Sequence, residues 1–147
     1  MRKRGQLDQP FIYIFAIIVI AFILLFGLRY IGKTKEFNDK AIYLNFKSSL
    51  QDAVTSAYNK NPETFLTFSQ SSANKPLSLP EEIKEICFQQ SNGKTKIIPD
   101  SKIYQEFTIN SLSPSTTNLC IKTYGGLSFR LENKIINKQT IVIIDHA

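Results

Sequence analysis

The stretch FIYIFAIIVIAFILLFGL, residues 11–28, decides the architecture of this chain. Its eighteen residues carry no charge, and fourteen of them are Ile, Leu, Phe or Val. At a rise of about 1.5 Å per residue the stretch measures about 27 Å as a helix, and residues 29–31 extend it to the roughly 30 Å hydrocarbon thickness of a bilayer. The sequence therefore predicts a transmembrane helix over residues 11–31.

Two other interpretations of this stretch are a buried soluble helix and a cleaved secretory signal. A soluble helix keeps a polar stripe, whereas this one is apolar on every face. A secretory signal has a shorter apolar region, about 7 to 15 residues, followed by a small-residue cleavage site. The sequence RYIGK follows at residues 29–33 and contains no Ala-x-Ala pattern. A membrane anchor therefore fits the stretch best.

The formal charge of +6 is divided evenly between the two parts of the chain. Arg2, Lys3, Arg4 and Arg29, offset by Asp8, supply +3, and residues 32–147 supply the other +3 with fourteen basic and eleven acidic side chains. Nucleic-acid binding needs Lys and Arg clustered on one face, and these lysines are scattered. We therefore expect no nucleic-acid partner.

The basic tip at residues 1–10 is expected on the cytoplasmic side of the membrane. The far flank of the helix also carries three basic residues, Arg29, Lys33 and Lys35, so the charge count alone leaves the orientation open. Two cysteines in the distal domain favour an oxidising compartment for it. We expect a single-pass protein of the cell membrane with its N-terminus inside and its C-terminal domain outside.

The leader Lys3-Arg4-Gly5-Gln6, followed at once by a long apolar helix, resembles the class III signal peptide of archaeal type IV pilin-like proteins. The resemblance covers about thirty residues and implies cleavage between Gly5 and Gln6, which leaves the apolar helix as the subunit's N-terminus and assembly surface. Many pilins of this type carry Glu five residues into the mature chain, where this sequence has Pro10. The alternative is that the basic residues are only a topology signal.

Residues 32–61 form a predicted amphipathic helix. Phe46, Leu50, Ala53 and Ala57 recur at helical spacing, with Ile42, Val54 and Tyr58 beside them. Pro62 is expected to end the helix near Asn61. The apolar stripe predicts packing either against the chain's own sheet or against a partner helix, and Gly32 leaves open whether this helix continues the anchor.

The remaining residues, 62–147, predict a small β-rich domain. The expected strands cover residues 64–68, 83–89, 94–98, 103–109, 119–124, 127–131 and 140–144. Asn92-Gly93 predicts a two-residue hairpin, and Gly125-Gly126 a second one between residues 119–124 and 127–131. The segment 140–144 is apolar without alternation, which is typical of a strand covered on both faces. Helix first and strands afterwards give an α+β fold with an antiparallel sheet.

Cys87 and Cys120 lie in two of the predicted strands and are candidates for a disulfide in an exported domain. The alternative is a pair of buried free thiols. Neither cysteine has a second ligand at Cys-x-x-Cys or Cys-x-His spacing, so no metal site is predicted.

Catalytic chemistry is not indicated by any motif. The single histidine, His146, is next to the last residue, and Glu81, Glu82 and Glu85 are interpreted as solvated surface. No glycine loop for phosphates is present, and we expect no cofactor. The sequence thus predicts a non-enzymatic membrane-anchored surface protein, either a pilin-like structural subunit or a tethered binding or accessory module of a larger membrane complex.

Overall fold

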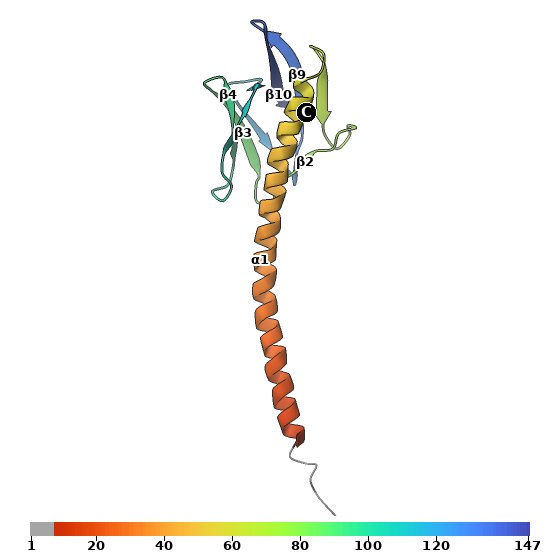
Figure 1. Ribbon diagram of the computed structural model, residues 1–147, viewed down its shortest axis with the longest axis vertical. Helices are drawn as coiled ribbons and strands as arrows, with labels where there is room; N and C mark the ends of the chain where they lie inside the picture. The colour runs from red at the N-terminus through yellow and green to blue at the C-terminus, as the bar shows by residue number, and fades with distance from the viewer. Residues whose placement is uncertain (1–7) are drawn as a thin grey trace, which may run out of the picture. The chain divides into compact units, whose positions relative to one another are not determined.

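The computed structural model of the chain describes residues 8–147, which contain one helix and ten strands (Figure 1). The chain divides into two compact units, Met1–Asn38 and Asp39–Ala147. The architecture is α+β, as the sequence predicts: an N-terminal helix comes first, and sheets that are mainly antiparallel follow it.

Helix α1 covers Asp8–Tyr58. Its residues up to Asn38 are the described part of the first unit, and its remaining residues belong to the second unit. Its large apolar side chains from Phe11 to Ile31 are 38 to 74 % exposed, and no residue of its most apolar window is buried. A core helix of a soluble domain would be mostly buried, so that interpretation is wrong for this segment. The helix is long and apolar enough to cross a membrane, and it is a candidate membrane-spanning segment.

The anchor and the amphipathic segment are parts of the same helix. Gly32 lies within α1, where a side chain would meet no other atom, and no helix boundary occurs at this position. The helix ends at Tyr58 rather than at Asn61, because the backbone amide of Lys60 bonds to the carbonyl of Ala57, three residues back. The predicted end was therefore three residues too late.

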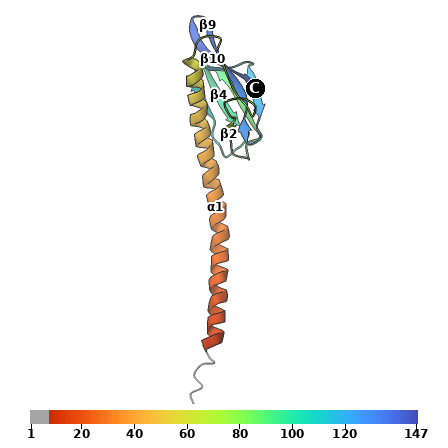
Figure 2. The same cartoon turned by 90° about the vertical axis from the view of Figure 1, so that its right-hand side faces the viewer.

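In the second unit, α1 buries the predicted stripe against the chain's own strands. Phe46, Leu50, Ala53 and Ala57 are all buried, whereas Tyr58 is partly exposed. Figure 2 shows the strands gathered on one side of the last turns of the helix. Burying a Phe or Leu side chain stabilises a fold by about 1.5 to 3 kcal/mol, so this stripe fixes the helix on its domain. Packing on the chain's own sheet is thus confirmed.

One four-stranded sheet, here called sheet II, has the order β5-β4-β3-β7. Its strands are β3 (Glu85–Ser91), β4 (Lys94–Pro99), β5 (Phe107–Asn110) and β7 (Asn118–Lys122), all antiparallel. The hairpin between β3 and β4 is confirmed: Asn92 and Gly93 both have positive φ, 50° and 75°. The strand expected over residues 103–109 begins only at Phe107, and Ile103 is exposed.

The other four-stranded sheet, sheet I, has the order β1-β9-β10-β6. It contains β1 (Phe65–Phe68), β6 (Leu112–Pro114), β9 (Phe129–Ile136) and β10 (Gln139–His146), and its β10–β6 pair is parallel. β9 and β10 form a hairpin whose turn residues, Asn137 and Lys138, have φ of 51° and 65°.

The second predicted hairpin is wrong. β7 pairs with β3 in sheet II, whereas β9 pairs with β1 and β10 in sheet I. Between them the chain passes through the short strand β8 (Gly126–Leu127), which pairs with β2 (Leu77–Ser78). The turn at Gly125, with φ of 76°, therefore changes sheet instead of reversing within one.

Buried and more exposed side chains alternate at the start of β9, whereas the middle of β10 is at least half-buried at every position. Leu127 on β8 is buried, as are Phe129 and Leu131 on β9, whereas Arg130 between the last two is exposed. In β10 only Val142 and Ile144 are fully buried; Thr140, Ile141 and Ile143 are half-buried, and Asp145 is exposed. β10 is therefore covered fully on one face and partly on the other, so the prediction of two covered faces was too strong.

Candidate functional site

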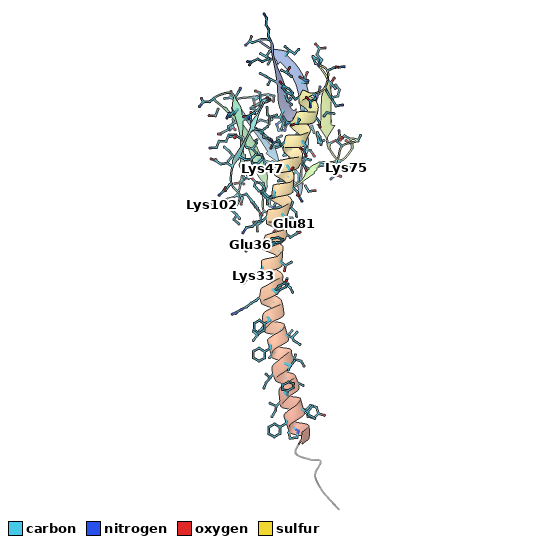
Figure 3. All side chains as sticks on the ribbon, in the orientation of Figure 1. Lys33, Glu36, Lys47, Lys75, Glu81 and Lys102 are labelled. Carbon is cyan, nitrogen blue, oxygen red and sulfur yellow. A yellow bond between two sulfur atoms is a disulfide. The ribbon has the colours of Figure 1, made fainter. Side chains whose placement is uncertain are left out.

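The first candidate surface is the apolar part of α1, residues 10–31. Figure 3 shows rings and aliphatic side chains projecting from this part of the helix on all sides. Phe22 and Phe26, one helical turn apart, stack with ring centroids 6.1 Å apart. A surface of this kind is stable in a bilayer or against other apolar helices, since no backbone group of the helix is left without a partner there.

Basic residues follow the apolar surface directly. Lys33 and Lys35 follow it within about one turn, and Arg29 lies near its end. Long basic side chains of this kind extend their charged ends to the polar interface of a membrane while their stems cover apolar surface. The flank therefore fits the end of a membrane span.

The second candidate surface is the outer face of sheet II, which carries the predicted disulfide. Cys87 on β3 and Cys120 on β7 are direct cross-strand partners with Cα atoms 4.0 Å apart, and they are bonded to each other. Their neighbours Ile86, Phe88 and Ile121 point into the core, so the bridge lies on the opposite, half-buried face. The predicted pairing is confirmed, and the alternative of two buried thiols is wrong.

Glu85 lies beside this bridge, although the sequence placed it on solvated surface with Glu81 and Glu82. The latter two are exposed in the loop before β3, whereas Glu85 is half-buried at the start of the strand. One of its carboxylate oxygens and the two Sγ atoms all lie within 4.8 Å of one another. The register of β3 with β7 creates this cluster, because it brings Cys120 beside the two residues of β3.

A groove borders β7, with a cavity volume of about 580 Å³. Its lining comes from β3, β7, β8, the segments on either side of β8, the end of β10 and the segment between β1 and β2. It comprises Gln70, Pro76, Glu85, Cys120, Ile121, Lys122, Tyr124, Gly125, Gly126, Ser128, His146 and Ala147. The volume is in the range of small-molecule sites. Tyr124 is 91 % exposed, so this aromatic side chain stands at the rim of the groove.

His146 lies near Ser115 and Asp145, three residue types that together form hydrolase triads. The Ser115 hydroxyl donates to Asp145 Oδ1 at 2.9 Å, and the backbone amide of His146 donates to the same oxygen at 2.8 Å. These bonds hold the pKa of Asp145 below its usual value. A triad requires the imidazole between hydroxyl and carboxylate, and here the hydroxyl bonds the carboxylate directly. This arrangement is suited to fixing the end of β10.

The remaining predicted site residues, Gly5 and Gln6, lie outside the described residues. Comparison of the chain with protein-family models, curated proteins and solved structures finds no match. The functional argument therefore depends on the surfaces described above.

Proposed function

We propose that this chain is a non-enzymatic, membrane-anchored surface protein built as a pilin-like structural subunit. One observation carries the proposal: a single helix, Asp8–Tyr58, is apolar and unburied in its first part and supplies a core element of an α+β unit in its last part. In such a chain one helix supplies both an assembly or membrane segment and a core element of the displayed domain.

The apolar part of the helix requires a non-aqueous environment. Leaving its Ile, Leu and Phe side chains in water would cost about 1.5 to 3 kcal/mol for each one. Two environments remove that cost: the bilayer, and the equivalent helices of neighbouring copies. A pilin-like subunit uses both, first as a membrane protein and then as part of an assembly.

The N-terminal sequence also supports the pilin-like interpretation. The resemblance of Lys3-Arg4-Gly5-Gln6 to a class III signal peptide implies a mature chain that begins at Gln6. Pro10, which replaces the Glu of many pilins, lies in the first turn of α1, where its missing N–H breaks no helical hydrogen bond. The substitution is therefore compatible with the helix.

The proposed orientation has the N-terminus in the cytoplasm and the second unit outside the cell. The basic tip agrees with the tendency of Lys and Arg to remain on the cytoplasmic side. The Cys87–Cys120 bridge supports the same orientation, because disulfides persist in oxidising compartments.

A second candidate function is a tethered binding or accessory module of a larger membrane complex. The groove beside β7 favours it, because Glu85, Lys122 and His146 bring charged and titratable groups to one cavity. In this case the leader would remain on the protein, and the anchor would serve only to hold the groove near the membrane.

The two functions are distinguished by the N-terminus of the mature protein. The chain should be expressed in cells with and without a class III signal peptidase, purified from membranes and measured by intact mass. A pilin-like subunit begins at Gln6 only when the peptidase is present. Gly5→Leu, which enlarges the residue before the cut, should block processing, and Gln9→Ala should not.

A chain that retains Met1 or Arg2 in peptidase-containing cells would exclude the pilin-like route. A processed chain should also form cross-linked oligomers through the apolar helix, whereas an unprocessed chain that remains monomeric in the membrane would support the binding module.

A further inference from the structure

The outer face of sheet II gathers three metal-ligating side chains from two strands: Glu85, Cys87 and Cys120. Their ligand atoms lie within 4.8 Å of one another, and all three residues are half-buried. Cys87 and Cys120 are cross-strand partners, and Glu85 precedes Cys87 by two residues, which places both side chains on the same face of β3. The pairing of the strands thus assembles a donor set that is absent from any local stretch of sequence.

Glu85 is available as a ligand. Within residues 8–147 its carboxylate makes no hydrogen bond and no ion pair. This holds even though Lys122 on β7 is the residue directly opposite Glu85 in the paired strands. A half-buried carboxylate beside two sulfur atoms has lost part of its hydration without gaining a protein partner. A cation bound between the three groups would provide the missing interaction.

We infer that the reduced form of this cluster binds one thiophilic divalent cation of the Zn²⁺ class through Cys87, Cys120 and Glu85. Two thiolates with one carboxylate suit Zn²⁺, which accepts sulfur and oxygen ligands in tetrahedral geometry. The inference goes beyond the proposed function and does not depend on it, because it needs only the second unit and a reductant.

The chemistry balances in two steps. A dithiol reductant gives two electrons and two protons to the Cys87–Cys120 bridge, so the S–S bond breaks, two thiols form and the reductant closes its own disulfide. Zn²⁺ then binds both sulfurs as thiolates, and two protons leave to solvent. Zn–S bonds of about 2.3 Å require sulfurs roughly 3.7 Å apart, which rotation about the two Cα–Cβ bonds provides once the S–S bond is broken.

The cluster borders the groove beside β7. Glu85 and Cys120 both line that groove, which is open to solvent. A water molecule can therefore complete the tetrahedron. Because the same sulfur atoms form either the disulfide or the metal bonds, the oxidised chain cannot hold the cation.

The test uses the full chain in detergent micelles under anaerobic conditions, either oxidised or reduced with a phosphine. Equilibrium dialysis against Zn²⁺, followed by metal analysis, should find one ion per reduced chain and none per oxidised chain. Co²⁺ serves as the spectroscopic probe, and should give thiolate charge-transfer bands with the visible bands of a tetrahedral site. Glu85→Gln should weaken Zn²⁺ binding at least tenfold, whereas Glu82→Gln, in the exposed loop before β3, should leave it unchanged.

Thermal unfolding is a second measurement of Zn²⁺ binding, and it applies even to a reduced chain of low stability. Saturating Zn²⁺ should raise the unfolding midpoint of the reduced wild-type chain, and should raise that of Glu85→Gln less. The inference is overturned by a reduced chain that takes up no Zn²⁺, by one that stays unfolded in saturating Zn²⁺, or by equal binding to wild type and Glu85→Gln.

Discussion

The side-chain amide of Asn133 on β9 donates to the backbone carbonyl of Tyr58, the last residue of α1, at 3.1 Å. The same Nδ2 also donates to the carbonyl of Lys60 at 2.6 Å. Helix ends leave carbonyls without intrahelical partners, and here a residue 75 positions away supplies the donor. Asn133 is 1 % exposed and its two bonds are part-buried, so they tie the end of the helix to sheet I.

Replacing Asn133 with Ala should lower the free energy of unfolding by about 1 to 3 kcal/mol, because two part-buried hydrogen bonds are lost. Urea unfolding of the full chain in detergent, followed by tyrosine fluorescence, measures this change. Asn45→Ala, at an exposed position on α1, is the matched control and should change it by less than about 0.5 kcal/mol. Equal effects of the two substitutions would contradict the role of Asn133.

Sequence periodicity predicted where the helix and strands lie better than it predicted which strands pair with one another. The stripe on α1 and the Asn92-Gly93 hairpin are local patterns, and both are confirmed. The chain from Leu119 to Leu131 looked like a hairpin because two strands flank Gly125-Gly126, yet each strand pairs elsewhere. Strand pairing is decided by which apolar faces bury together, and that information is distributed over the whole domain.

The same difference between local patterns and strand pairing applies to the candidate site. The sequence identified Cys87 and Cys120 because cysteines are few, and the bridge is present. It missed Glu85 as their neighbour, since that contact requires the register of β3 with β7. The one local sign was the two-residue spacing of Glu85 and Cys87, which places both on one face of a strand.

Tyr43 should make the domain sensitive to alkali. Its hydroxyl donates to the carbonyl of Gln105 at 2.6 Å, and burial, with a smaller contribution from Tyr104, raises its pKa from 10.0 to about 12. Because the folded pKa is the higher one, this stabilisation is complete below pH 10 and is lost as the pH rises toward 12.

The free energy of unfolding should therefore fall more steeply between pH 10 and 12 in the wild-type chain than in Tyr43→Phe. Tyr43→Phe should also lose about 1 kcal/mol at neutral pH, the usual contribution of one hydrogen bond. Urea titrations at several pH values measure both effects. Tyr124→Phe, at a position 91 % exposed, should show the same fall in the free energy of unfolding with pH as the wild-type chain. If Tyr43→Phe showed that same fall, Tyr43 would not be the group responsible for the alkaline sensitivity.

Reduction of the Cys87–Cys120 bridge should lower the stability of the second unit. The bridge joins residues 33 positions apart, and closing a loop of that length stabilises by roughly 3 to 4 kcal/mol in the chain-entropy estimate. Thermal unfolding with and without a phosphine, both in the presence of a chelator, measures the loss. The double variant Cys87→Ala, Cys120→Ala should not respond to the phosphine. A wild-type chain equally insensitive to it would show that the bridge contributes little.

The apolar part of α1 should hold the chain in membranes during alkaline carbonate extraction. Replacing Ile17, Ile20 and Leu24 with Arg costs roughly 2.5 to 3.5 kcal/mol per residue at the centre of a span, which exceeds the several kcal/mol that the segment gains on insertion. This variant should appear in the carbonate supernatant. Exchanging the same positions conservatively, with Leu at 17 and 20 and Ile at 24, should leave the protein in the pellet. Release of the unmodified chain would disprove the anchor.

The proposed orientation predicts that the thiols of Cys87 and Cys120 become reachable from outside the cell. Both residues lie on the half-buried outer face of sheet II, so a phosphine and then a membrane-impermeant maleimide should reach them without unfolding the domain. Labelling of intact cells should require the phosphine, since within residues 8–147 both cysteines are bridged and none is free. The double Ala variant at these positions gives the background. Labelling that occurs only after lysis would place the second unit in the cytoplasm, and the basic residues beyond the span, Arg29, Lys33 and Lys35, would then be the ones that set the topology.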